Sequence, residues 1–530
     1  MKDDDSGRSE PFGSPDGASE EPGTFIEFPD AGVWRDLALR ATDRRARILV
    51  GRRGSGKSRY LRMMQLSVLK EGLLDYPQRD TKINLSSLRW MHRAFPDRAE
   101  RLEIWEELWS CAVYAGVASF LLHCGPSAMS AAPLSEKDRT FLAEDARNFI
   151  PRGPREHPVV AVLNNILHTY SDRSRLVGFL RNPVWLSIES ITLDTINVST
   201  PVFAFIDALD DNYSEAPAES TDAQLGLVTW ILRKIVDPNV SNRLHVVVTV
   251  RDVIYAALLD TDNGQRYNDR QHIRCLDWDE RSSRYYLEQK IGKLPVEYRA
   301  GRNSSKVVIE RWLGFSTMTN PRRADAVEDV GDYILRHTRF LPREINEIGN
   351  NISRSIGAND SVKRDADPAD IRRTVATVAR SFARTVIREV SLHLAALDKV
   401  DAQDPRGADY AGQISEAVHA FIRAVGKEVF DPARLRLADS EFCSAAPWWS
   451  AEVGANKLRI QDILWQHGLI GYRRAADPNR WVRYFNSAAW AEGDLIAVLP
   501  SAEQYVLHSA LLDILPVQAH PLAPIAHTDG

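Results

Sequence analysis

The sequence has few cysteines and no long apolar run, and both absences exclude classes of protein. Its 4 cysteines among 530 residues lie far apart and form no CxxC pair, which argues against a zinc site or a secreted disulfide framework. No apolar stretch reaches the ~20 residues that a membrane helix needs. The N-terminal residues also lack the apolar core of a signal peptide. We therefore expect a cytoplasmic protein without a membrane partner.

Charge of one sign is not in large excess either. The formal net charge is −5, with 44% hydrophobic and 26% charged residues, an ordinary balance for a globular protein. The chain as a whole does not attract nucleic acid, so any such surface must be local. Residues 1–24 are acidic and rich in Gly, Ser and Pro, and this composition predicts disorder. The tail at 517–530 is also predicted to be disordered.

Short apolar runs alternate with helical periodicity in the first half of the chain. We expect strands at Ala46–Val50, Lys82–Leu85, Val202–Ile206 and Leu244–Thr249. A helix pattern at Gln224–Val236 separates the last two, which predicts neighbouring parallel strands in a sheet covered on both faces. The predicted fold class is therefore α/β.

A glycine-rich segment directly follows the first of these strands and precedes an amphipathic helix. Its residues are Gly51, Arg52, Arg53, Gly54, Ser55, Gly56, Lys57 and Ser58. They match G-x-x-x-x-G-K-[ST], in which glycines let backbone N–H groups surround a phosphate. Lys57 would contact the β- and γ-phosphates as a catalytic charge, and the Ser58 hydroxyl would ligate Mg²⁺. The motif predicts a P-loop nucleoside triphosphatase that binds ATP, or less readily GTP, with Mg²⁺.

A second acidic motif follows the Val202–Ile206 run. The strand ends in Asp207, and Asp210 and Asp211 come shortly after it. This Walker B pattern resembles that of the signalling and AAA-like ATPases of the STAND and ORC-related group. The resemblance implies that Asp207 holds Mg²⁺ through water and that Asp210 or Asp211 acts as the base for the attacking water. Asp211 stands where that group usually has Glu, and its shorter side chain implies slow hydrolysis.

The same resemblance extends to three arginines. Arg251 follows the Leu244–Thr249 run, as in the sensor-1 strand of the group, and would detect the γ-phosphate; a surface position is the alternative. Arg339 and Arg343 lie in a segment similar to the sensor-2 region of a helical lid. Either of them could then reach the nucleotide.

The C-terminal region has a local basic character. The pattern in Lys457–Phe485 predicts a helix ended by Gly468, followed by two strands around Ala475–Asn479. A helix followed by a hairpin looks like a winged helix. Its arginines are Arg473, Arg474, Arg480 and Arg483. Two roles remain open: contact with the phosphates of duplex DNA, or packing within the chain or on a protein partner.

The expected organisation has six parts and three possible functions. The parts are a disordered tail (1–24), an ATPase core (25–275) with a helical insertion (about 99–170), a helical lid (276–356), a helical linker (357–440), a winged helix (441–516) and a second tail (517–530). The leading hypothesis is a regulatory Mg-dependent ATPase, a switch in signalling or defence that could form homo-oligomers. One alternative is a DNA-dependent ATPase of the ORC type. The other is a module that holds nucleotide without turnover.

Overall fold

The computed structural model describes most of the chain. The described residues are 10–15, 26, 39–71, 74–76, 82–123, 134–150, 159–196, 201–207, 216–259, 271–300, 305–320, 326–357, 366–397, 410–447, 459–477, 480–485, 498–515 and 519. They form two compact units. The first, here called the α/β unit, comprises 31–53 and 57–276. The second, here called the C-terminal unit, comprises 1–30, 54–56 and 277–530.

A five-stranded parallel sheet organises the α/β unit. Its strands are β1 (Ile48–Val50), β2 (Leu74–Tyr76), β3 (Val202–Ile206), β4 (Leu244–Val250) and β5 (Ile273–Cys275). The order is β2-β3-β4-β1-β5, and every pairing is parallel. The predicted α/β class and the adjacency of β3 and β4 are confirmed. The strand predicted at Lys82–Leu85 is wrong, because a helix begins there at Leu85 and the extra strand is β2.

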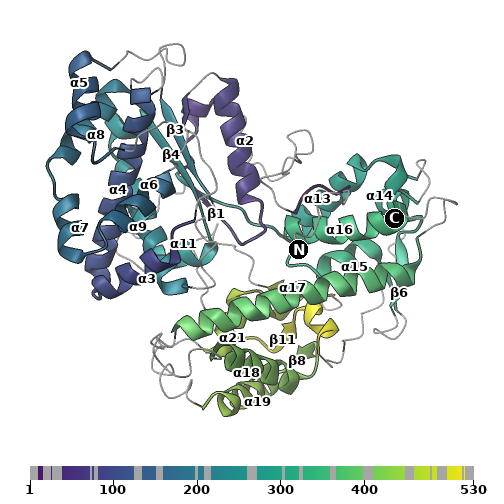
Figure 1. Ribbon diagram of the computed structural model, residues 1–530. Helices are drawn as coiled ribbons and strands as arrows, with labels where there is room; N and C mark the ends of the chain where they lie inside the picture. The colour runs from purple at the N-terminus through teal and green to yellow at the C-terminus, as the bar shows by residue number, and fades with distance from the viewer. Residues whose placement is uncertain are drawn as a thin grey trace, which may run out of the picture. The chain divides into compact units, whose positions relative to one another are not determined.

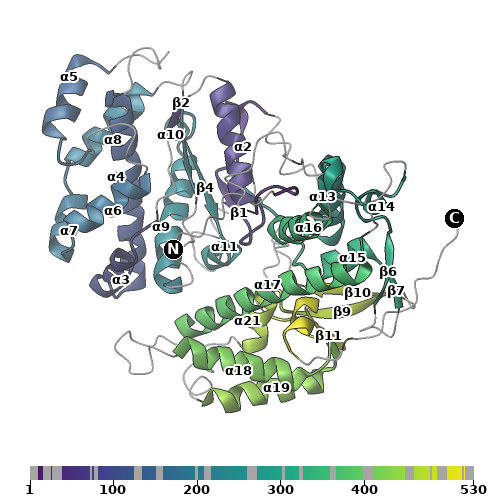
Figure 2. The same ribbon diagram turned by 45° about the vertical axis from the view of Figure 1, so that its right-hand side comes forward.

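Helices cover both faces of the sheet, as the fully buried strands β3 and β4 require. The helices of this layer are α2 (Lys57–Lys70), α9 (Pro217–Ile235), α10 (Pro238–Ser241) and α11 (Asp252–Leu259), with a short 3-10 turn η2 (Ala41–Asp43). In Figures 1 and 2, α2 lies on one face of the sheet and α9 on the other. Tyr60 and Met64 of α2 pack against Phe203, Phe205 and Val247 of the strands.

A helical insertion separates β2 from β3. Its elements are α3 (Leu85–Ala94), α4 (Arg98–His123), α5 (Glu136–Thr140), the π-helix η4 (Phe141–Asp145), α6 (Val159–Thr169), α7 (Arg173–Leu180) and α8 (Val184–Thr195). The insertion therefore extends beyond the predicted 99–170. Helix α4 packs closely on α9, since a Cβ on Gly226 would lie 2.5 Å from the Cβ of Trp105. The Trp109 indole donates to the Ala223 carbonyl (2.7 Å), so both tryptophans are core residues.

The first half of the C-terminal unit is mainly helical. Its elements are α13 (Glu280–Lys293), the 3-10 turn η5 (Val296–Tyr298), α14 (Val308–Leu313), β6 (Thr317–Asn320), β7 (Ala326–Asp329), α15 (Val330–Arg336) and α16 (Pro342–Gly357). Strands β6 and β7 form an antiparallel pair. The surrounding core is built on Leu287, Trp312, Ile345 and Ile348.

Part of the segment predicted to be disordered, residues 10–15, belongs to this core. Phe12 is 1% exposed and packs against Trp312, with ring centroids 5.0 Å apart. Asn350 fixes the segment by accepting from the Phe12 N–H (2.7 Å) and donating to the Gly13 carbonyl (3.0 Å). Gly349 leaves room for the ring, because a Cβ there would lie 2.4 Å from it. Disorder is therefore a wrong prediction for these six residues.

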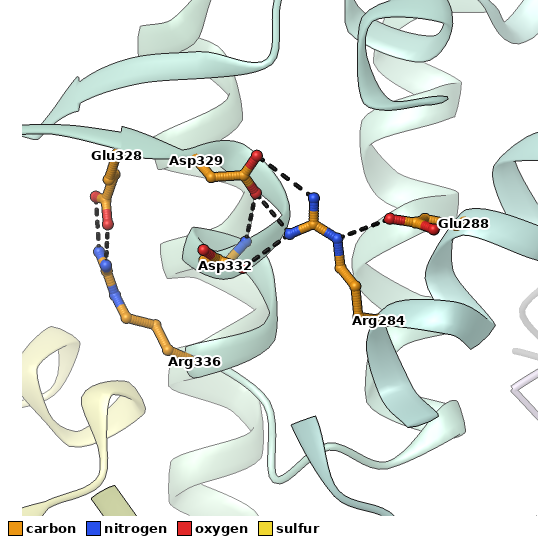
Figure 3. A network of polar contacts seen from close by, with 6 residues as sticks. All are labelled: Arg284, Glu288, Glu328, Asp329, Asp332 and Arg336. Carbon is orange, nitrogen blue, oxygen red and sulfur yellow. Dashed lines mark hydrogen bonds and ion pairs between the residues drawn. The ribbon is translucent and has the colours of Figure 1, made fainter. Parts of the chain in front are cut away.

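Two arginine networks connect α13, β7 and α15 (Figure 3). Arg284 pairs with Asp329 (2.7 Å), Asp332 (2.8 Å) and Glu288 (2.9 Å). Arg336 pairs with Glu328, which is 3% exposed. Burial and the neighbouring Asp329 raise the pKa of Asp332, against the effect of Arg284. The buried Glu328 carboxylate and the more exposed carboxylates around Arg284 each have a cation beside them, so the networks have a structural explanation.

The second half of the C-terminal unit combines helices with a small sheet. Its elements are α17 (Pro368–Leu397), α18 (Tyr410–Val425), β8 (Val429–Phe430), α19 (Pro432–Ala445), α21 (Ile460–Gln466), β9 (Ile470–Asp477), β10 (Arg480–Phe485), β11 (Gln504–Leu507) and the 3-10 turn η9 (Ser509–Asp513). The sheet order is β10-β9-β11-β8. The predicted hairpin is β9–β10, and Gly468 ends α21 at a φ of 71°.

Helix α17 contributes to two hydrophobic clusters. Its Ile371 and Val375 join the core around Trp312, whereas Val386 and Val390 join the core of α18, α21 and the small sheet. The region predicted as a linker, 357–440, thus shares a core with the hairpin, and no boundary between cores falls at residue 440. Among the described residues, no helix is both long and apolar enough to cross a membrane.

Candidate functional site

The carboxyl ends of β1, β4 and β3 form the edge of the sheet where polar residues gather. Strand β4 lies between the other two, and the chain leaves β1 toward β2 but leaves β4 toward β5. Adjacent parallel strands whose connections run in opposite directions create a crevice at their carboxyl ends, the usual ligand position in such sheets. The glycine-rich loop begins at this point, directly after β1.

The loop takes the backbone conformations that its glycines allow. Gly54 has a φ of 88° and Gly56 a φ of 92°, a region that side chains with a Cβ rarely occupy. The Gly51 N–H donates to the Val250 carbonyl (3.2 Å), which ties the start of the loop to β4. Helix α2 begins at Lys57, so its N-terminal N–H groups follow the loop immediately.

Lys57 is buried within the same segment. It is 8% exposed, and its ammonium donates to the carbonyls of Gly51 (2.8 Å) and Arg52 (3.0 Å). The side chain thus folds back over the loop rather than extending into solvent. Ser58 is the second residue of α2 and is half-buried.

Asp207 lies at the end of β3, beside the end of β4. The register pairs Ile206 with Val248, which brings Asp207 next to Thr249. The Thr249 hydroxyl donates to the Asp207 carboxylate, and Thr249 is 4% exposed. A neighbour on β4 therefore fixes the position of one carboxylate oxygen.

The two arginines of the loop differ in their surroundings. Arg52 is buried and pairs with Asp252, the first residue of α11, at 3.2 Å. Arg53 is exposed. Arg52 therefore connects the loop to the segment after β4, a role that the loop motif alone does not predict. Asp252 was missed, although its place directly after Arg251 and the β4 run could have drawn attention to it.

Arg251 is buried, with 8% exposure, so the alternative of a surface arginine is excluded. It lies between β4 and α11, and its carbonyl accepts from the N–H groups of Ile254 (3.1 Å) and Tyr255 (3.2 Å). Its position beside the loop follows from the pairing of β1 with β4.

The tip of the loop, Gly54–Gly56, belongs to the C-terminal unit, where it contacts Trp278, just before α13, and Arg343 of α16. The Arg343 N–H donates to the Gly54 carbonyl (3.3 Å), and the Trp278 indole donates to the Ser55 carbonyl (2.8 Å). A Cβ on Gly54 would lie 3.0 Å from the Cβ of Arg343. Trp278 was not predicted, because a single tryptophan so far away in the sequence gives no signal.

The Ser55 side chain has a buried polar atom without a protein partner. Ser55 is 2% exposed, and its Oγ makes no hydrogen bond to any residue in the described part of the chain. A buried hydroxyl without a partner costs about 1–3 kcal/mol. A ligand oxygen at the loop would satisfy it, so this atom fits a site for a phosphate-bearing group.

The two predicted lid arginines have different environments. Arg339 is engaged by Glu344, through its side chain at 2.6 Å and its backbone N–H at 2.6 Å. Arg343 is half-buried and contacts the loop through its backbone, and its guanidinium makes no hydrogen bond or ion pair with another described residue. Of the two, Arg343 is the one adjacent to the loop.

Several predicted residues are only partly described. Asp210 and Asp211 lie outside the described residues. Arg474, Arg480 and Arg483 are placed by backbone alone, in the antiparallel β9–β10 pair, where Arg483 is the register partner of Arg473. Arg473 donates weakly to Gln504 of β11 (3.5 Å).

A turn at 338–343 connects the loop contact to the small sheet within the C-terminal unit. Phe340 has a φ of 63°, a strained value for a residue with a side chain. The Ala510 N–H donates to Nδ1 of His508, so Nε2 is the protonated nitrogen and donates to the Thr338 carbonyl (2.9 Å). His508 is 4% exposed. A strained turn thus lies between Arg343 and His508.

Comparisons with known proteins do not identify a family. The chain matches no protein-family model and no curated protein. Among the described residues, no group of three or more His, Cys, Asp or Glu side chains is arranged to hold a metal ion. A function must therefore be inferred from the residues at the sheet edge.

Proposed function

We propose that the protein is a P-loop ATPase that binds ATP, or less readily GTP, with Mg²⁺ at the loop Gly51–Ser58. The observation that carries the proposal is the loop itself. It begins at the carboxyl end of β1, contains two glycines with positive φ, and is followed by the buried Lys57 at the start of α2. This arrangement would present N–H groups to a phosphate, and also the Lys57 ammonium once it leaves the Gly51 and Arg52 carbonyls.

The residues present fit the nucleotide and its metal. Lys57 would hold the β- and γ-phosphates, and the unsatisfied Ser55 hydroxyl gives an oxygen ligand a further donor. Ser58 and Asp207 would share the Mg²⁺, which supplies charge neutralisation at the phosphates. Thr249 orients Asp207 for this role. Asp210 or Asp211 stays the proposed base, with Arg251 as the sensor of the γ-phosphate.

A regulatory switch is the leading form of this proposal, in signalling or defence. The contacts from Gly54 through Arg343, the strained Phe340 and Thr338 to His508 support it. Two hydrogen bonds, at Gly54 and at His508, are joined by the backbone of residues 338–343, so the loop is connected to the end of the small sheet. Occupation of the loop would shift this turn between two conformations, since a strained residue has a less strained alternative.

A DNA-dependent ATPase of the ORC type is the second candidate. The observation that favours it is the hairpin β9–β10 after α21, with Arg473 and Arg483 at opposed register positions. In this candidate the hairpin is the wing of a winged helix that contacts DNA phosphates. The third candidate, a module that holds nucleotide without turnover, has the same loop contacts.

Phosphate release from ATP tests these candidates together. The purified protein is assayed with Mg²⁺, with EDTA, and with Mg²⁺ plus duplex DNA. We expect Mg-dependent release that is slow and indifferent to DNA, because Asp211 is shorter than the usual Glu. Acceleration by DNA would favour the second candidate, and tight ATP binding without release would favour the third.

The switch makes a further prediction for the same samples. ATP is expected to slow hydrogen exchange at the backbone amides of 505–511, and His508→Ala is expected to abolish that effect while ATP still binds. If ATP does not change hydrogen exchange of these amides in the native protein, the switch is contradicted but the nucleotide site is not.

A further inference from the structure

Helix α17 has one face that carries only arginines and small hydroxylated residues. Its exposed residues include Arg373, Thr377, Arg380, Ser381, Arg384, Thr385 and Arg388. The four arginines follow one another at intervals of seven, four and four residues, which keeps them on one side of a helix with 3.6 residues per turn. We call these seven residues the arginine face. The opposite side of α17 is buried in two cores, so the orientation of this face is fixed.

The charge of this helix is unusual for a solvated surface. Residues 371–388 contain five arginines and no Asp or Glu, between Asp370 and Glu389 of the same helix, in a chain of net charge −5. Solvated helix faces ordinarily mix both signs, since opposite charges four residues apart are stabilising. Here Arg384 lies four residues from both Arg380 and Arg388, and each like-charged pair costs about 0.2–0.5 kcal/mol. No described acidic side chain pairs with Arg384 or Arg388 to offset this cost.

The guanidinium groups of this face are available to an external partner. Arg384 and Arg388 make no hydrogen bond or ion pair with any residue that the structure describes. Within the described part of the chain, the Arg380 guanidinium bonds only to its own helix, at the Ala376 carbonyl (3.2 Å) and the Thr377 hydroxyl (3.1 Å). Arg373 pairs with Asp370. Arg372, in contrast, points elsewhere and donates to the Thr319 carbonyl (2.7 Å).

The dimensions and chemistry of the face fit a phosphate backbone. From Arg373 to Arg388 the helix rises about 22 Å at 1.5 Å per residue, the length of about six to seven base pairs at 3.4 Å. Arg, Ser and Thr are common donors to phosphate and sugar oxygens. A membrane-surface helix would instead turn its apolar side to the lipid, and the apolar side of α17 is packed in the protein core.

We propose that the arginine face of α17 is a binding surface for the sugar–phosphate backbone of duplex nucleic acid. The arginine face lies outside the β9–β10 hairpin and contains no residue of the nucleotide loop. The proposal can therefore be tested separately from the proposed ATPase. Contacts of this kind are independent of base sequence and strongly dependent on salt.

Fluorescence anisotropy with a labelled 20-base-pair DNA duplex tests this surface over a salt series from 50 to 200 mM. Four phosphate contacts predict a slope of log K against log salt of about −3.6. The triple variant R380Q/R384Q/R388Q is expected to bind at least about 30-fold more weakly at the lowest salt, with a slope reduced by about 2.7. The matched control R89Q/R93Q/R436Q removes three exposed arginines of α3 and α19 and is expected to stay within about 3-fold of the native protein.

Three further measurements make the test decisive: thermal unfolding, duplex binding by Lys57→Ala, and binding to vesicles of anionic phospholipid. Thermal unfolding should show the triple variant at least as stable as the native protein, because arginine–arginine repulsion is removed. The variant Lys57→Ala should bind the duplex normally, which separates this surface from the ATP site. Equal loss in the triple variant and its control would overturn the proposal, as would salt-independent binding or binding only to vesicles of anionic phospholipid.

Discussion

The substitution Asp207→Asn is expected to lower phosphate release from Mg-ATP at least about 100-fold, the scale of losing one charge-stabilising group at a reacting centre. Asp207 ends β3 beside Thr249, whose hydroxyl holds one carboxylate oxygen. Removing the negative charge weakens the hold on Mg²⁺ but leaves the loop unchanged. ATP binding measured in EDTA should therefore remain within a few-fold of the native protein.

Two further variants show whether this result is specific to the Asp207 carboxylate. Thr249→Val removes only the hydroxyl that orients the carboxylate and is expected to give a smaller loss, of about 10-fold. Asp172→Asn makes the same chemical change at the N-cap of α7 and should leave turnover unaltered. If Asp207→Asn retains more than about a third of native turnover, Asp207 is not the metal carboxylate.

The substitution Arg101→Met is expected to lower the free energy of unfolding of the α/β unit by about 3–5 kcal/mol, the cost of breaking a buried ion pair on one side. The side chains of Arg101 and Asp222 are 5% and 4% exposed and meet at 2.8 Å, joining α4 to α9. Arg101 also donates to the carbonyls of Phe95 (2.6 Å) and Pro96 (3.2 Å). These acceptors and the Asp222 carboxylate would lose their buried donor.

A second arginine that pairs with the Asp222 carboxylate provides the control. Arg98 also pairs with Asp222 (3.1 Å), but its side chain is 57% exposed. Arg98→Gln is expected to cost no more than about 1 kcal/mol, as exposed pairs do. Urea unfolding followed by tryptophan fluorescence measures both variants, because Trp105 and Trp109 lie on α4. Equal shifts for the two substitutions would show that burial of the pair has no part in stability.

The sequence predicted the central elements of the sheet because their signals are local. Strand β3 is a continuous apolar run and β4 is apolar except for His245 and Thr249, and all residues of both are buried. The turn from β1 into α2 contains the full loop motif. Strand β2 was missed because it has three residues, Leu74–Tyr76, one of them charged. A segment this short owes its conformation to its neighbour β3 rather than to its own composition.

Long-range partners explain the other differences. The surroundings of Phe12 are polar, yet the ring fills a space left by Gly349, more than three hundred residues away. Arg339 looked as available as Arg343 in the sequence, but Glu344 in the first turn of α16 engages it. The partners of Arg52 and Ser55, Asp252 and Trp278, are likewise brought near by folding alone. No local pattern identifies such contacts.

Equilibrium binding of a fluorescent ATP analogue to the native protein and to Lys57→Ala tests the nucleotide site most directly. Lys57 is the buried cation of the loop, and its removal is expected to weaken binding at least about 10-fold. The control is Lys70→Ala, which removes an exposed lysine from the other end of the same helix. Saturable binding by the native protein and the control, with loss only in Lys57→Ala, is the predicted result. Absence of binding to the native protein, or equal affinity in all three, would contradict the account.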